Sequence, residues 1–252
     1  MPKLDGKVAL ITGSGRGMGK SHALLMAEEG ASIILQDIDG ALVTEAAAEV
    51  KAKGVKVHTI VCDVADAKVF PREIAAAGKA MGGHIDILVN NAGIDTPGTI
   101  EEITDEAFQR MFDIHVKGAF LATRSVVPGM KARRQGKIVN VSSIWGMVGH
   151  SSHSHYCGAK AALLGLTKAW AKELAPHNIM VNAIAPGAVI TEMVLQKGGM
   201  AYVNEIAQLI PMKRFADCIE MSYTVLFLCS HESDFITGQV ISPNGGDTIV
   251  GI

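Results

Sequence analysis

Residues 7–19 read KVALITGSGRGMG, and this segment is the starting point for predicting the fold of the chain. The segment begins with a short apolar run, KVALIT, which is typical of a buried strand. A glycine-rich loop, TGSGRGMG (12–19), follows at once and leads into the helical pattern GKSHALLMAEEG. Glycine lets the backbone turn tightly beside a pyrophosphate, and the helix N-terminus offers free N–H groups. This order predicts a dinucleotide-binding unit, although the glycine spacing is G-x3-G-x-G and no register gives G-x-G-x-x-G.

Beyond this unit, strand-like and helix-like segments alternate to the end of the chain. Longer amphipathic segments such as GALVTEAAAEVKAKG separate the strands, and no linker or repeat interrupts them. Continuous apolar strands that alternate with helices predict an α/β fold, a parallel sheet covered on both faces. We therefore predict one doubly wound domain over residues 1–252. Its further strands are predicted at 31–37, 55–61, 85–90, 137–142, 179–185 and 238–242.

One segment, at about 188–214, has a weak pattern. It carries Met193, Met200 and Met212, with KGG at 197–199, and it follows the sixth strand. Loops at that edge of an α/β sheet face the ligand, so the segment is predicted to be a mobile substrate lid. The alternative is an ordinary helical insertion packed on the domain.

Composition narrows the possible partners and the location. Apolar residues make up 48% of the 252 residues, charged residues 19%, and the net charge is −2. These values predict no nucleic acid and no membrane surface as main partner, and no apolar run reaches membrane-spanning length. The N-terminus lacks the pattern of a signal peptide. The four cysteines have no CxxC spacing, so they are interpreted as reduced thiols of a cytoplasmic protein.

An acidic residue after the second strand predicts the cofactor. Asp37 ends that strand, and an acid about 20 residues beyond a glycine loop binds the ribose hydroxyls of NAD. Arg16 in the loop argues for a 2′-phosphate instead. Because Ile38 and Asp39 supply no cation, we expect Asp37 to prevail and NAD to be preferred over NADP. The alternative for Asp37 is a helix-capping or turn acid. Asp63 ends the third strand and is placed to reach the adenine.

A tyrosine and a lysine indicate acid–base chemistry. Tyr156 and Lys160 are spaced i, i+4, which places them on one face of a helix. A tyrosine titrates near pH 10, and an adjacent ammonium lowers that pKa. Tyr156 is then able to take a proton from an alcohol or return it to a ketone. NVSS (140–143) offers Ser142 and Ser143 to hold the substrate oxygen. A chance occurrence of Y-x3-K is the alternative.

Together these residues resemble the short-chain dehydrogenases/reductases, along essentially the full length of the chain. The shared motifs occur in the order of the family: TGSGRGMG, NNAG (90–93), the serine strand, YCGAK (156–160) and PG (186–187). The resemblance implies a Rossmann-type fold with a seven-stranded sheet, usually in a homotetramer. It also implies NAD(P)-linked oxidation of alcohols or reduction of carbonyl compounds.

The resemblance also implies roles for single residues. Tyr156 is the implied acid/base, Lys160 lowers its pKa and binds the nicotinamide ribose, and Ser143 orients the substrate oxygen. Tyr156 and Lys160 also count among the implied cofactor contacts. The other implied contacts are Gly13, Ser14, Arg16, Gly17, Met18, Gly19, Asp37, Ile38, Asp63, Val64, Asn90, Ala92, Gly93, Pro186, Gly187, Val189 and Thr191.

His115 departs from the family pattern. The family often has asparagine in the segment written here FDIHVKGAF (112–120), where it helps to hold a water beside the active-site lysine. Imidazole can donate and accept hydrogen bonds, so His115 is predicted to take part in this proton relay as a catalytic residue. The alternative is that the ring only packs against the cofactor side of the helix.

Three further histidines, His150, His153 and His155, precede Tyr156. No Asp or Glu occurs from Ile138 to Trp170, so no neighbouring carboxylate supports a metal site there and no metal is predicted. His150 and His153 are predicted to contact a polar or anionic substrate group, together with Ser143 and Tyr156, and plain surface exposure is the alternative. Trp145 and Met147 are predicted as apolar pocket walls. The substrate would then have one apolar face and one polar end.

Three functions remain open from the sequence. The leading hypothesis is an NAD-dependent oxidoreductase that interconverts a small-molecule secondary alcohol (polyol, sugar, hydroxy acid or cyclic alcohol) and its ketone. The second is an NADPH-dependent 3-oxoacyl thioester reductase, for which Arg133 and Arg134 offer a basic carrier-protein patch. The third is a protein that senses NAD without turnover, against which the intact Ser143, Tyr156 and Lys160 argue.

Overall fold

The computed structural model describes residues 2–196 and 198–250. Over these residues, seven parallel strands form one sheet in the order β3-β2-β1-β4-β5-β6-β7. The predicted doubly wound parallel sheet is confirmed, and each strand lies within a few residues of its predicted range. The strands are β1 (Val8–Thr12), β2 (Ser32–Asp37), β3 (Val57–Val61), β4 (Ile87–Asn90), β5 (Gly136–Val141), β6 (Ile179–Ile184) and β7 (Val240–Ile241).

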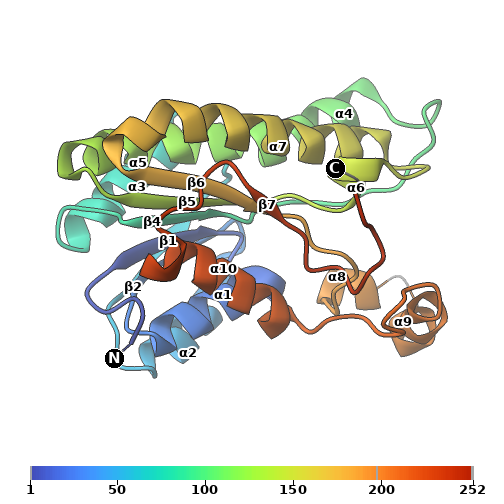
Figure 1. Cartoon of the computed structure of the whole chain (residues 1–252), viewed down its shortest axis with the longest axis horizontal. Coiled ribbons are helices and arrows are strands. Elements are labelled where there is room, and N and C mark those ends of the chain that lie inside the picture. The colour runs from blue at the N-terminus through green and yellow to red at the C-terminus, as the bar shows by residue number, and fades with distance from the viewer. Residues whose placement is uncertain (1, 197, 251–252) are drawn as a thin grey trace.

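Helices cover both faces of the sheet (Figure 1). One face carries α1 (Gly17–Glu28), α2 (Gly40–Lys51) and α10 (Cys218–Cys229). The other carries α3 (Val69–Ala80), α4 (Asp105–Phe112), α5 (Gly118–Arg133) and α7 (Ser154–Leu174). A π-helical turn, η1 (Asp113–Lys117), joins α4 to α5. The remaining short elements are α6 (Trp145–Val148), η2 (Ala175–His177), α8 (Glu192–Leu195), α9 (Gly199–Ala207) and η3 (His231–Ser233).

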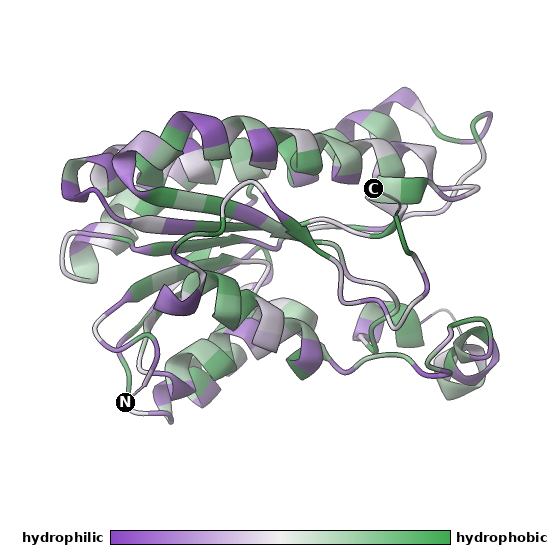
Figure 2. Cartoon of the chain, in the orientation of Figure 1, coloured by the Kyte–Doolittle hydropathy of each residue, from purple (hydrophilic) through white to green (hydrophobic). Residues whose placement is uncertain are grey.

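Apolar side chains fill the space on each side of the sheet. Figure 2 shows the strands as mainly hydrophobic, in contrast to the mixed colouring of the helices. Ile11 and Val139 face the cluster beneath α1 and α10, whereas Leu10 and Ile138 face the cluster that includes Phe70 of α3. Successive strand residues point to opposite faces, and here both faces are buried. The strands therefore read as continuous apolar runs rather than alternating ones.

The strand order reverses beside β1, which pairs with β2 on one side and β4 on the other. Ligands of open α/β sheets bind outside the carboxyl ends of the strands at such a switch point. The glycine loop after β1 and the NNAG segment after β4 meet there. Asn91 joins them, because its Nδ2 donates to Thr12 O at 2.9 Å and to Gly13 O at 3.0 Å.

The predicted lid segment at 188–214 forms α8 and α9, which extend beyond the sheet (Figure 1). It has a small core of its own, built from Val203, Ala207, Ile210 and Phe215. The helical character agrees with the alternative interpretation, and α8 also lines the cavity described below, as a lid requires. Movement of the segment stays a prediction. Lys197 of the segment, and Met1, Gly251 and Ile252 of the predicted domain 1–252, lie outside the described residues.

None of the helices within residues 2–196 and 198–250 is both long and apolar enough to cross a membrane.

A buried histidine joins α1 to α10. His22 Nδ1 lies 2.8 Å from Ser222 Oγ, which also lies 2.8 Å from Ser21 Oγ. The other ring nitrogen, Nε2, is buried with no hydrogen-bond partner among the described residues. Burial lowers the pKa of His22 from 6.5 to about 3, since a charged imidazolium there would lose its water.

We expect this histidine to make the fold acid-sensitive. The unfolded chain takes up the proton near pH 6.5 and the folded chain only near pH 3. The contribution of neutral His22 to stability is therefore fully present above pH 6.5 and is lost as the pH falls from 6.5 towards 3. Urea unfolding at several pH values should show that His22→Gln flattens the slope of unfolding free energy against pH by up to about 1.4 kcal/mol per unit. His231→Gln, at an exposed histidine, is the control. Equal slopes in the His22 variant and the parent would contradict the prediction.

Candidate active site

A cavity of about 680 Å³ lies at the switch point, at the carboxyl ends of the strands. That volume is within the usual range of ligand pockets. The residues that line it come from the carboxyl ends of β1 to β6 and the loops after them, from α8 and α9, and from α1, α4, η1, α6 and α7. Most predicted site residues are among them: Gly13, Arg16, Gly17, Met18, Gly19, Asp37, Ile38, Asp63, Val64, Ala92, Gly93, His115, Ser143, Trp145, His150, His153, Tyr156, Lys160, Pro186, Gly187, Val189 and Thr191.

The glycine loop holds the predicted ribose acid in place. Gly15 N donates to Asp37 Oδ2 at 2.9 Å, and Asp39 N donates to Asp37 Oδ1 at 3.1 Å. A Cβ at Gly15 would come within 2.9 Å of Asp37 Oδ2, so the missing side chain permits this contact. The capping role considered for Asp37 belongs to Asp39, whose Oδ1 accepts from Ala41 N and Leu42 N of α2. The Asp37 carboxylate lines the cavity, and its bond from Asp39 N also fits the turn role considered for it.

Arg16 contacts the lid segment rather than the Asp37 side of the cavity. Its Nη1 lies 3.3 Å from Glu192 Oε2 at the start of α8. Both side chains are about half exposed, so the pair adds little stability. The pair does place Arg16, the cation of the glycine loop, beside α8. The sequence alone could not predict a contact between two residues so far apart in the chain.

Asp63 also has a partner that the sequence analysis missed. Arg110 of α4 places Nη1 2.7 Å from Asp63 Oδ2. The salt bridge holds Asp63 at the wall of the cavity, which Arg110 and Val64 also line. A long-range cation of this kind has no signal in local sequence.

Two predicted cofactor contacts, Ser14 and Asn90, are not among the residues that line the cavity. Ser14 is fully buried, and its hydroxyl donates within the protein to the Ile11 carbonyl at 3.0 Å. Asn90 Nδ2 donates to Asn140 Oδ1 at 2.8 Å in the interior. Strand residues alternate between faces, so the side chain of the next residue, Asn91, reaches the cavity instead.

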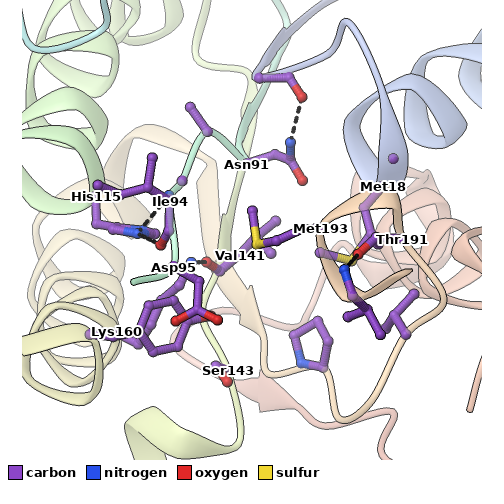
Figure 3. Close-up of a pocket in the computed structure, with 18 of the residues that line it drawn as sticks. Met18, Asn91, Ile94, Asp95, His115, Val141, Ser143, Lys160, Thr191 and Met193 are labelled. Atoms are coloured by element: carbon purple, nitrogen blue, oxygen red, sulfur yellow. Dashed lines mark hydrogen bonds between the residues drawn. The ribbon is translucent and has the colours of Figure 1, made fainter. Parts of the chain in front are cut away.

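The residues predicted to carry the chemistry come together in the cavity. Tyr156 and Lys160 lie on α7, and the Lys160 amine is 5.5 Å from the centroid of the Tyr156 ring. Lys160 Nζ donates to Val141 O at 2.8 Å, as Figure 3 shows. The two serines after β5 divide their roles. Ser142 Oγ donates to the Lys160 carbonyl at 2.8 Å and fastens α7, whereas Ser143 Oγ accepts from Trp145 N at 3.2 Å and keeps its own proton to donate.

Burial dominates the electrostatics of this pair. It raises the pKa of Tyr156 above its usual value, and the Ser143 hydroxyl acts in the opposite direction. It lowers the pKa of Lys160 from 10.5 to about 7, with Asp95 opposing the change. Burial therefore works against the charged form of Lys160, and the Asp95 carboxylate favours it. The contacts of the protein alone thus favour a neutral phenol, and the expected lowering of the Tyr156 pKa by Lys160 stays a prediction.

His115 lies in the π-helical turn η1, a rare element that often marks functional sites. Its Nε2 lies 2.8 Å from the Ile94 carbonyl, and its ring is 5.5 Å from the Tyr156 ring, edge-on. Nδ1 is buried with no hydrogen-bond partner among the described residues. Burial, and then the charge of Lys160, lower the pKa of His115 well below its usual value, so the ring is neutral. A Cβ at Gly93 would collide with it. The packing is clear, and the proton relay stays a prediction.

The three clustered histidines occupy different environments. His150 stacks on Trp145 with ring centroids 4.0 Å apart, at the exposed rim of the cavity. His153 is buried, and its Nε2 lies 3.3 Å from Asp95 Oδ1. His155 does not line the cavity, because its Nε2 faces Thr96 Oγ1 at 3.2 Å.

Asp95 is the main residue that the sequence analysis missed. The segment from 138 to 170 has no acid, but Asp95 comes from the loop after β4 and supplies a carboxylate to His153. The available signal was its position two residues past NNAG, at the ligand edge of the predicted sheet. No three His, Cys, Asp or Glu side chains of the described part of the chain gather as a metal ion would need.

This cavity combines a glycine-rich loop at a helix N-terminus with a tyrosine and a buried lysine, which is the arrangement of a dinucleotide-linked oxidoreductase acting on alcohols and carbonyl compounds. The chain belongs to the short-chain dehydrogenase family, whose sequence pattern matches residues 7–201.

Similar proteins differ in what their names say they act on. A 3-oxoacyl-(acyl-carrier-protein) reductase from Thermotoga maritima is 40% identical over 244 residues, which are 97% of this chain and 98% of that protein. A cyclopentanol dehydrogenase from a Comamonas species is 38% identical over 250 residues, 98% of this chain and 99% of that protein. The structure of carveol dehydrogenase from Mycobacterium avium in complex with NAD has a TM-score of 0.93 at 31% identity, and the match covers 98% of this chain and 99% of that chain.

Proposed function

We propose that this chain is an NAD-dependent secondary-alcohol dehydrogenase that works on a small polyol, sugar, hydroxy acid or cyclic alcohol. The observation that carries the proposal is the shared cavity of Ser143, Tyr156 and Lys160, with the Asp37 carboxylate in the same cavity. The first three supply acid–base chemistry at an alcohol, and Asp37 supports the choice of NAD.

The proposed chemistry divides the work among three side chains. Ser143 donates a hydrogen bond to the substrate oxygen and holds it beside Tyr156. Tyr156 removes the hydroxyl proton as the substrate carbon loses a hydride, and it returns the proton in the reverse reaction. The Lys160 ammonium stabilises the phenolate. When bound, the oxidised nicotinamide would supply the hydride acceptor, and its positive charge would favour the phenolate further.

The preference for NAD rests on the charges at the end of β2. The Asp37 carboxylate, held by Gly15 N, would repel a 2′-phosphate. Arg16, the cation that argued for NADP, is paired with Glu192. The similar carveol dehydrogenase is an NAD complex, which agrees with this choice.

A 3-oxoacyl thioester reductase is the second candidate, supported by the 40% identity to the Thermotoga protein. The position of Arg133 and Arg134, the basic patch considered for a carrier protein, argues against this function. Both residues precede β5, so they lie at the amino edge of the parallel sheet, and the cavity opens at the carboxyl edge. Arg133 is also engaged with Asp86 Oδ1 at 3.2 Å, and Arg134 with the Pro176 carbonyl at 3.1 Å. A carrier protein bound there would be far from Tyr156.

The test is the initial rate of NAD⁺ and NADP⁺ reduction with cyclic alcohols, polyols, hydroxy acids and a 3-hydroxyacyl thioester. We expect turnover of free alcohols with NAD⁺ preferred by about 100-fold in kcat/KM, since like charges that meet at a binding site cost several kcal/mol. Asp37→Ser should narrow that preference. Asp234→Asn, at an exposed acid, is the matched control and should leave it unchanged.

Other outcomes would replace the proposal. Main turnover of the thioester with NADP⁺ would favour the reductase. Tight NADH binding without turnover of any compound would favour the NAD-sensing alternative. The homotetramer and the cytoplasmic location stay predictions and do not enter this test.

A further inference from the structure

We propose that Asp95 and His153 form a second polar contact for the substrate, one that takes a hydroxyl group. The preferred substrate is then a cyclic or short-chain alcohol that carries a further hydroxyl. This inference rests on the proposed function and narrows its substrate class.

Both residues lie in the wall of the cavity that holds Ser143 and Tyr156. Their side chains are largely buried, with 11% of Asp95 and 9% of His153 exposed. Figure 3 shows the Asp95 side chain among the residues that line the cavity, and its charge acts on the pKa values of Tyr156 and Lys160. The Trp145 ring connects the two parts of the site, because its centroid is 4.7 Å from the His153 ring and 5.9 Å from the Tyr156 ring. A small substrate held by Tyr156 is thus within reach of the pair.

The donors and acceptors of the pair match a hydroxyl. His153 Nδ1 lies 3.1 Å from the Ser151 carbonyl, which can only accept, so Nδ1 carries a hydrogen. Nε2 lies 3.3 Å from Asp95 Oδ1 but makes no hydrogen bond to a described residue. A substrate hydroxyl can donate to Asp95 and accept from a protonated Nε2, or donate to Nε2 when that atom is unprotonated. The hydroxyl thereby gives the buried Nε2 of His153 a hydrogen-bond partner.

Other groups fit this position less well. A ketone or ether oxygen only accepts and offers Asp95 no donor. A carboxylate or phosphate would meet the Asp95 charge in a largely buried place, where repulsion is weakly screened. The pair therefore argues against hydroxy acids within the proposed substrate list. The nearby Trp145, Ile94 and Met193 line the same cavity and supply apolar surface for the carbon skeleton.

A purely structural role is the competing explanation. His153 directly precedes α7 and forms a bridge with Gly98, whose N donates to Ser152 O at 2.8 Å, so the pair lies where two loops are joined. Substitutions that only loosened these loops would lower the turnover of every substrate alike. A contact to a second hydroxyl would affect only substrates that carry one.

The experiment compares cyclohexanol with trans-1,2-cyclohexanediol, which share a ring and differ by one hydroxyl, with the cofactor the enzyme prefers. We expect the parent to prefer the diol. Asp95→Asn, which keeps the shape and removes the charge, should lower kcat/KM for the diol by about 10- to 100-fold, mainly through KM, because hydrogen bonds to charged groups are of that strength. For cyclohexanol the change should stay within about threefold, the range of near-neutral substitutions.

His153→Gln provides a second variant in case the first disturbs folding, and Asp234→Asn is the control at an exposed acid. NADH affinity, measured by fluorescence titration, should be unchanged in all three. An equal loss for both alcohols, no loss for either, or a parent without preference for the diol would overturn the inference. Turnover of cyclohexanol by the parent would leave the proposed function standing in each case. Failure of the parent on every alcohol would refute the proposed function itself.

Discussion

Replacing Tyr156 with phenylalanine is expected to lower kcat for alcohol oxidation by about 10³-fold, the usual range for loss of a general acid or base. The phenyl ring keeps the edge contacts with His115 at 5.5 Å and Trp145 at 5.9 Å, so only the hydroxyl is lost. Ser143 would still hold the substrate oxygen, but no group beside it would take the proton. The rate of cofactor reduction at saturating alcohol measures the effect.

Binding measurements separate this loss from damage to the site. NADH titration should give nearly the same affinity for Tyr156→Phe as for the parent. Tyr223→Phe is the matched control, because that tyrosine is 58% exposed on α10, and it should retain the parent rate. If Tyr156→Phe kept the parent rate, Tyr156 would not be the proton carrier and the proposed mechanism would fail.

Gly19→Ala is expected to weaken NADH binding by about 10- to 100-fold, because overpacking of this kind costs about 1–3 kcal/mol. A Cβ at Gly19 would collide with the Gly13 carbonyl and lie 2.6 Å from Asn91 Nδ2. The loop after β1 or the start of α1 must then shift. Both shape the proposed pyrophosphate site, so affinity should fall together with thermal stability. Fluorescence titration and thermal unfolding measure the two effects.

The matched control is Gly165→Ala on α7, where a Cβ would meet nothing within 4 Å. Alanine favours a helix over glycine by about 1 kcal/mol, so this variant should melt no lower than the parent and bind NADH equally well. Parent-like NADH affinity in Gly19→Ala would contradict the prediction, because it would show that the loop accommodates a Cβ at this position.

The sheet could be predicted because its strands leave a pattern in the local sequence. Strands such as 32–37 and 136–141 are buried on both faces, and this leaves a continuous apolar run in the sequence. The short β7 was predicted at 238–242 and covers Val240–Ile241, because pairing with β6 decides where a strand ends. The lid segment was harder, since α8 and α9 pack on a small core of their own and lack the pattern of a helix on the main sheet.

The cavity could be predicted only in part. Glycines, Asp37, Ser143, Tyr156 and Lys160 are each placed by a spacing within one strand, loop or helix, and these residues line the cavity. Ser14 and Asn90 belong to the same motifs but turn inward, since neighbouring residues of an extended chain face opposite sides.

The sequence by itself determined the order of strands and helices, the glycine loop at the first turn and the Tyr156–Lys160 spacing, because periodicity and short-range stereochemistry act over a few residues. Only the tertiary structure decided which distant side chains meet. It placed Glu192 beside Arg16, Arg110 beside Asp63, and Asp95 beside His153. It also decided that burial dominates the pKa values of Tyr156 and Lys160, because loss of water around a group depends on everything packed against it.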